Sequence, residues 1–151
     1  MFDSVPQFRT VFRDLTQAML ALNVKDARIR EGLRITQAVI SSFKESLGKK
    51  NINFLVVMIH NKPYAYSKMV RNVDPDFEPA FFELVNMEQQ VTRLFVEYFV
   101  DNAISYIDAH PFIQSRFSQG IPPYTMSDDH HPNSAGYEAI AQSASAALIN
   151  F

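Results

Sequence analysis

The chain of 151 residues contains no cysteine, which excludes disulfide bonds, thiolate zinc sites and a cysteine nucleophile. It lacks any apolar run near the roughly 20 residues that a membrane-spanning helix needs, and its N-terminus lacks the charged-then-apolar order of a signal peptide. The net charge is only −2, so nothing points to nucleic acid or to an anionic membrane surface. The sequence therefore predicts a soluble protein.

The composition that is present favours one globular domain over residues 1–151. Hydrophobic residues make up 47% of the chain and charged residues 20%, with 13 phenylalanines, which is ample material for a core and unlike a disordered segment. A chain of this length buries about two-thirds of the surface that it exposes when unfolded.

Apolar residues at three- and four-residue spacing predict four helices. The first is expected to begin at about Ser4, acting as its cap, and the second to end at Gly48 in left-handed backbone. The third begins at Asn86, and the last begins at Ser134 with Asn133 as its cap. The apolar stripes consist of Phe8, Val11, Phe12, Leu15, Met19 and Leu22; of Ile29, Leu33, Ile40, Phe43 and Leu47; of Val91, Leu94, Phe95, Tyr98 and Phe99; and of Tyr137, Ile140, Ala141, Ala144 and Leu148.

Two segments have the pattern of strands. NFLVVMI (53–59) is apolar on both faces and too short for a buried helix, which is typical of a parallel strand, and ISYID (104–108) is a second candidate. Residues 60–85 hold three prolines and little periodicity, which predicts a loop. Alternating helices and strands predict an α/β fold with helices on both faces of a parallel sheet. Because two strands are few for such a sheet, either further strands lie in segments interpreted as helix or loop, or the chain is the C-terminal part of a larger domain. We favour the second interpretation.

The stretch SDDHHPNSAGYEAIA (127–141) holds two of the four histidines. It follows the second strand and precedes the last helix, which places it at the carboxyl edge of the sheet, where α/β proteins bind ligands. A serine hydrolase needs an imidazole to take the proton of the hydroxyl and an acid to orient that imidazole. Asp128 lies three residues before His131 in a turn closed by Pro132, so one loop delivers both groups. Asp129 and His130 are expected to face solvent.

The same stretch resembles the last sequence block of the SGNH (GDSL-like) hydrolase superfamily. The match is carried by Asp128, His131, Pro132, Asn133, Gly136, Tyr137, Ile140 and Ala141. The run KKNINFLVVMIHNKPYAY is similar to a late strand and loop of the branch that contains O-acetyl esterases and transferases. The resemblance covers residues 35–151 and implies a flavodoxin-like, three-layer α/β/α fold. It also implies that Asp128 and His131 are catalytic in an ester hydrolase that forms an acyl-enzyme on a serine.

The nucleophile of such an enzyme is not evident. In the superfamily the serine lies in a Gly-Asp-Ser motif after the first strand, and a later Gly and Asn complete the oxyanion hole. None of these motifs occurs in this chain. The nearest segment is MFDS, which ends at Ser4 with no room for a preceding strand. We therefore expect the chain to supply the Asp–His part of the site, with a small-molecule or glycan ester as substrate and no cofactor.

Other interpretations remain open at this point. The chain can be a catalytically silent α/β module that binds a partner, or an O-acyltransferase in which a sugar hydroxyl replaces water. The DDHH run with His110 can also form a zinc or manganese site.

His60 is interpreted as a packed or rim residue, Asp108 as a structural cap and Gly136 as a point of close helix packing. An unpaired apolar edge at 53–59 predicts self-association.

Overall fold

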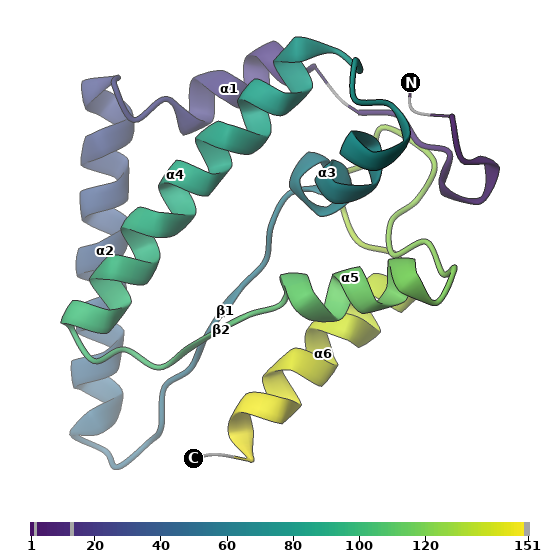
Figure 1. Cartoon of the computed structure of the whole chain (residues 1–151). Coiled ribbons are helices and arrows are strands. Elements are labelled where there is room, and N and C mark those ends of the chain that lie inside the picture. Colours follow the sequence, from purple (N-terminus) through teal and green to yellow (C-terminus); the bar gives the residue numbers. More distant parts are fainter. Residues whose placement is uncertain (2, 13, 150–151) are drawn as a thin grey trace.

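The computed structural model of the protein describes residues 1, 3–12 and 14–149 (Figure 1). The first half of the chain contains a 3-10 turn (Pro6–Phe8), helices α1 (Leu15–Leu22) and α2 (Ala27–Gly48), strand β1 (Val56–Met58) and helix α3 (Lys62–Val73). The second half contains helix α4 (Pro79–Asp101), strand β2 (Tyr106–Asp108) and helices α5 (His110–Ser118) and α6 (Ser134–Leu148).

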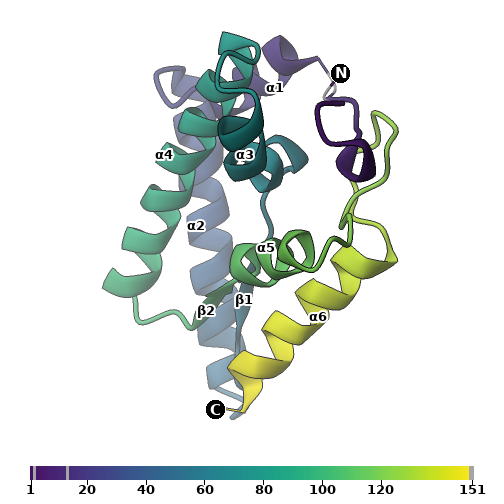
Figure 2. The ribbon, with the colours of Figure 1, turned by 45° about the vertical axis from the view of Figure 1, so that its right-hand side comes forward.

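Strands β1 and β2 pair in parallel, with Val57 opposite Ile107. This confirms the prediction of an α/β chain with parallel strands, although both strands are shorter than expected and only half-buried. Figures 1 and 2 show the strands passing between α2 and α4 on one side and α5 and α6 on the other. Helix α6 contacts both strands, and Phe99 of α4 packs against Tyr106 of β2 with ring centroids 5.4 Å apart.

The hydrophobic core lies around α3 rather than around the strands. It is contributed by α1, α3, the first half of α4, α5 and α6, and its largest fully buried apolar side chains include Tyr66, Phe81 and Leu84. Phe12 packs against Tyr66 and Phe81, with ring centroids 5.7 Å and 4.8 Å away. The N-terminal segment is therefore part of the core, and it lies next to the beginning of α3.

The prediction of a loop over residues 60–85 is wrong. Helix α3 occupies most of that stretch, and α4 begins at Pro79, earlier than the predicted start at Asn86. Helix α5 was also not predicted. Pro63, Pro79 and Pro111 each lie in the first turn of a helix, where the missing N–H of proline is not needed for an intrahelical hydrogen bond. These prolines therefore start helices instead of interrupting them.

The first helix begins later than its apolar stripe indicates. Val5, not Ser4, is the cap residue of the short 3-10 turn, and it makes no side-chain cap bond. Helix α1 starts after Asp14, whose carboxylate accepts hydrogen bonds from the N–H groups of Thr16 (3.0 Å) and Gln17 (3.2 Å). Between the turn and α1, the hydroxyl of Thr10 donates to the carbonyl of Thr125 (3.2 Å), a tertiary contact that competes with a helical conformation at Thr10.

Of the two other helix ends predicted from the sequence, the start of α6 agrees with the structure and the end of α2 agrees only in part. Gly48 is the last residue of α2, but the left-handed residue is Asn51, with φ of 56°. Helix α6 begins at Ser134 with Asn133 as its cap, as predicted. Its fully buried side is Gly136, Ala139 and Ser143 rather than the larger apolar residues, because the helix packs closely on its neighbours.

Over the described residues, no helix combines the length and apolarity that crossing a bilayer requires.

Candidate active site

The segment of residues 121–133 and the start of α6 are built around Asn133 and Gly136. The side chain of Asn133 caps α6 by accepting hydrogen bonds from two N–H groups of the first turn, including that of Gly136 (3.2 Å), and its amide donates to the carbonyl of Pro122 (2.7 Å). A Cβ on Gly136 would overlap the carbonyl oxygen of Pro123. Gly136 is therefore required for the close approach of α6 to the loop, which confirms the packing role expected for it.

A buried lysine fixes the same loop to the start of α3. Lys62, the first residue of α3, has no exposed surface. Its ammonium group donates to backbone carbonyls from two other segments: Ser127 (2.6 Å), Thr125 (2.9 Å), Val11 (3.2 Å) and Asp129 (3.3 Å). Because three of these carbonyls belong to residues 125–129, the loop is fixed to the start of α3, the helix that follows β1 in the chain.

His131 is exposed and is bound by one carboxylate. Its Nδ1 atom lies 2.6 Å from Oδ1 of Asp129, and the same oxygen accepts a hydrogen bond from the backbone N–H of His131 (3.0 Å). The side chain of His131 is 79% exposed. Nε2 has no hydrogen-bond partner among the described residues. The ring is thus held from one side and open to a reactant from the other.

The carboxylate on this ring is not the one that the spacing predicted. Asp128 was expected to orient His131, but in the structure that contact is made by Asp129, which was expected only to face solvent. The physical reason is local. A carboxylate two residues before the histidine closes a compact turn to the next backbone N–H, and it reaches Nδ1 from the same position. Asp128 is exposed, and its charge acts on the ammonium group of Lys62 instead.

The charges of the loop and of Lys62 influence one another. Burial lowers the pKa of Lys62 to about 8, and the neighbouring carboxylates of Asp129 and Asp128 oppose that change. The hydrogen bond from the backbone N–H of His131 lowers the pKa of Asp129, and the bond from the imidazole ring lowers it further. The carboxylate beside His131 is therefore held in its ionised form, as an acid that stabilises an imidazolium must be.

We compared the chain with protein-family models, with curated proteins and with solved structures. None of the three comparisons gives a match. The functional argument therefore depends on the residues of this chain and their geometry.

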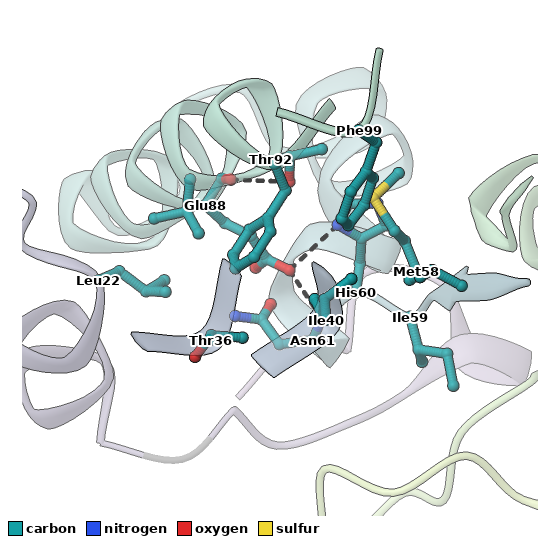
Figure 3. Close-up of a pocket in the computed structure, with 13 residues that line it drawn as sticks. Leu22, Thr36, Ile40, Met58, Ile59, His60, Asn61, Glu88, Thr92 and Phe99 are labelled. Carbon is teal, nitrogen blue, oxygen red and sulfur yellow. Dashed lines mark hydrogen bonds and ion pairs between the residues drawn. The ribbon is translucent and has the colours of Figure 1, made fainter. Parts of the chain in front are cut away.

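A second polar group, which the sequence did not reveal, is buried beside β1. His60 lies between two carboxylates: Nδ1 is 3.3 Å from Oε1 of Glu88, and Nε2 is 3.2 Å from Oδ1 of Asp108 (Figure 3 shows the contact with Glu88). Burial lowers the pKa of His60, but the hydrogen bonds with Asp108 and Glu88 outweigh burial and raise it to about 9. With both ring nitrogens occupied, His60 has a structural role, consistent with its interpretation as a packed residue.

The neighbours of His60 complete this group. Tyr64 stacks on its ring at 4.2 Å between centroids, and His110 packs edge-on against both rings. Asp108 also accepts a hydrogen bond from the backbone N–H of His110 (2.8 Å), the first residue of α5, although the cap residue of that helix is Ala109. Burial and the charge of His60 lower the pKa of His110 to about 4. His110 thus lies with His60, and no group of three or more metal-binding side chains occurs in the described part of the chain.

Among the described residues, Ser4 makes no contact that would activate it as a nucleophile. It is exposed in the bend before the 3-10 turn. No hydrogen bond joins it to His131 among the residues that the structure describes.

Proposed function

We propose that the loop of residues 125–131 carries the acid–base part of a serine ester hydrolase site, with His131 as the general base. The observation that supports this most directly is the one-sided anchoring of an exposed imidazole. When Nδ1 carries the proton and donates it to Asp129, Nε2 has a free lone pair directed at solvent. An imidazole in this state is the form that accepts the proton of a nucleophilic hydroxyl.

The proposed reaction has two halves. In the first, Nε2 of His131 takes the proton of a serine hydroxyl while the serine oxygen attacks the ester carbonyl, and the leaving alcohol then receives that proton. In the second, Nε2 takes a proton from water, the hydroxide attacks the acyl-enzyme, and the proton returns to the serine. Asp129 stabilises the imidazolium formed in each half, in place of Asp128.

The fold that accompanies this proposal is the flavodoxin-like, three-layer α/β/α arrangement. Its support is the parallel pair β1–β2, the helical connection through α3 and α4, and the contact of α6 with both strands. In such sheets the reactive groups lie beyond the carboxyl ends of the strands, and the bond of the loop to Lys62, at the start of the helix that follows β1, supports such a position.

The first experiment combines turnover with labelling. The chain would be tested for hydrolysis of p-nitrophenyl acetate and for reaction with a serine-directed phosphonate, followed by peptide mass mapping. We expect saturable hydrolysis, and one labelled serine whose position identifies the nucleophile. His131→Ala should reduce kcat by a factor of at least about 10³, since the base is lost while binding is kept.

The loop provides its own matched controls. His130→Ala removes the neighbouring imidazole and should retain the activity. Asp129→Asn should lower kcat, whereas Asp128→Asn should have a smaller effect, and the reverse order would restore Asp128 as the acid. Equal hydrolysis by the wild type and His131→Ala, or complete absence of turnover and labelling, would refute the proposal. The second result would favour the silent binding module.

A further inference from the structure

A cavity of about 400 Å³ lies between α2, α4 and β1, away from the loop that carries His131 (Figure 3). Its walls are mostly apolar and include Ile40 of α2, Val56 of β1, and Val91 and Phe95 of α4. Cavities of roughly 300–1,000 Å³ with apolar walls and a few polar groups are typical of small-molecule sites, and the space between packed helices is a common place for them.

One end of this cavity is polar because Glu88 lies there. Oε1 of Glu88 accepts a hydrogen bond from the backbone N–H of Asn61 (2.9 Å) and lies 3.3 Å from Nδ1 of His60. Oε2 is buried and has no hydrogen-bond partner among the described residues. A buried carboxylate oxygen without a donor is costly, and native structures seldom leave one without a reason. The residue as a whole is only 8% exposed.

The other polar atoms of the cavity are mainly acceptors. The hydroxyl of Thr92 donates to the carbonyl of Glu88 (2.9 Å) and that of Thr36 donates to Gly32 (2.9 Å), so both threonines offer only oxygen lone pairs to a ligand. The carbonyl oxygen of the Asn61 side chain already accepts a hydrogen bond from the backbone N–H of Tyr64. The NH2 group of the same side chain can donate a hydrogen bond. The cavity therefore matches a ligand whose polar end consists mainly of N–H or O–H donors.

The charges at this end favour a cation among such ligands. Because its pKa is raised to about 9, His60 is positively charged at neutral pH, and it is flanked by the two carboxylates of Glu88 and Asp108. One negative charge is left over in a largely buried place, where electrostatic interactions are stronger than in water. A neutral alcohol would satisfy the free oxygen of Glu88 but would not balance this charge.

We propose that the cavity between α2, α4 and β1 binds a primary amine with an apolar body, whose ammonium group donates to Oε2 of Glu88. The aliphatic or aromatic part of the ligand lies against Ile40, Val91 and Phe95, and a second donor of the ammonium reaches the oxygen of Thr92. The proposal does not depend on ester hydrolysis, since the cavity contains none of the residues of the His131 loop.

The test is a titration of the purified chain with 1-octylammonium, 1-octanol and octanoate at concentrations below their aggregation. Binding would be measured by calorimetry and by amide and methyl chemical shifts. We expect saturable one-to-one binding of the amine, with shifts at Val91 and Thr92, and weaker or absent binding of octanoate. Glu88→Gln should weaken the affinity for the amine by at least 10-fold and should change the affinity for 1-octanol little.

Two further variants keep the test decisive if Glu88→Gln unfolds. Val91→Phe fills the cavity without touching the carboxylate and should abolish amine binding, with circular dichroism confirming the fold. Val100→Phe makes the same change at a position of α4 that is 65% exposed and outside the cavity lining, and it should bind like the wild type. Absence of amine binding at millimolar concentration, or binding that Val91→Phe leaves unchanged, would overturn the proposal. Octanol binding as tight as that of the amine would overturn the assignment of a cation.

Discussion

The ammonium group of Lys62 lies 2.6 Å from the carbonyl oxygen of Ser127 and connects the beginning of α3 to the loop that carries His131. This contact joins residues that are 65 positions apart in sequence. It explains why a short loop without regular structure has a defined position, since a charged donor binds several of its carbonyls at once. The position of the candidate base therefore depends on a buried side chain from another part of the chain.

Removing this donor should loosen the loop. In Lys62→Met the carbonyls of Ser127 and Thr125 lose a buried partner, and we expect a loss of about 1–3 kcal/mol in the free energy of unfolding. Hydrogen exchange at residues 125–131 should increase more than exchange in α4. Lys68→Met, which changes an exposed lysine of the same helix, is the control and should leave both quantities unchanged. Equal effects of the two variants would contradict the anchoring role.

The two glycines at positions 136 and 32 should respond oppositely to alanine. A methyl group on Gly136 meets the Cβ of Pro132 at 2.6 Å and overlaps Pro123, so Gly136→Ala should destabilise the fold by about 1–3 kcal/mol. Nothing lies within 4 Å of the position in Gly32, inside α2, and Gly32→Ala should stabilise by about 0.5–1 kcal/mol. Urea denaturation of the two variants measures both values, and a tolerated Gly136→Ala would show that the loop can move away.

Local signals were sufficient for part of this structure. The β-branched run before Met58 predicted a strand, and Asn133 predicted the start of α6, because each depends on residues that are adjacent in sequence. The loop predicted around Pro63 and Pro79 was wrong because a proline interrupts a helix only in its interior. In the first turn of a helix, proline is well tolerated. A cap two residues before Pro63, at Asn61, was the available signal.

The candidate site was predicted less completely for a different reason. The choice between Asp128 and Asp129 depends on one turn of backbone that the motif spacing does not specify. The burial of Lys62 depends on the meeting of three separate segments, which no local pattern records. Glu88 had a weak signal, as a charged residue on the buried stripe of α4 between Val85 and Val91. Such a residue in an apolar stripe indicates a buried partner, which here is His60.

The stability of the protein should fall as the pH rises from 6.5 to about 9. The carboxylates of Asp108 and Glu88 raise the pKa of His60 from 6.5 to about 9, so the charged ring stabilises the fold fully below pH 6.5 and loses this effect between 6.5 and 9. The loss is about 3 kcal/mol. Lys62, whose pKa is lowered, acts with the opposite sign above pH 8.

A comparison of variants separates these two contributions. Unfolding free energies would be measured between pH 6 and pH 10 for the wild type, His60→Gln and His131→Gln. His60→Gln should remove the decrease in unfolding free energy that we attribute to the His60 ring. His131→Gln changes an exposed histidine and should keep that decrease. If all three proteins follow the same pH profile, the buried ring is neutral and the assignment of its charge is wrong.

Self-association is expected through the free edge of β1. Among the described residues β1 pairs only with β2, and Ile59 at its carboxyl end is 53% exposed. An unprotected strand with apolar neighbours is a template for another chain, so sedimentation should show oligomers at micromolar concentration. Ile59→Lys should shift the population toward the monomer, because a charge next to the edge opposes pairing. Phe43→Lys alters an apolar residue of α2 that is 56% exposed, and it should leave the oligomers intact. Dispersal by Phe43→Lys alone would locate the contact on α2, and a monomeric wild type would exclude association through either surface.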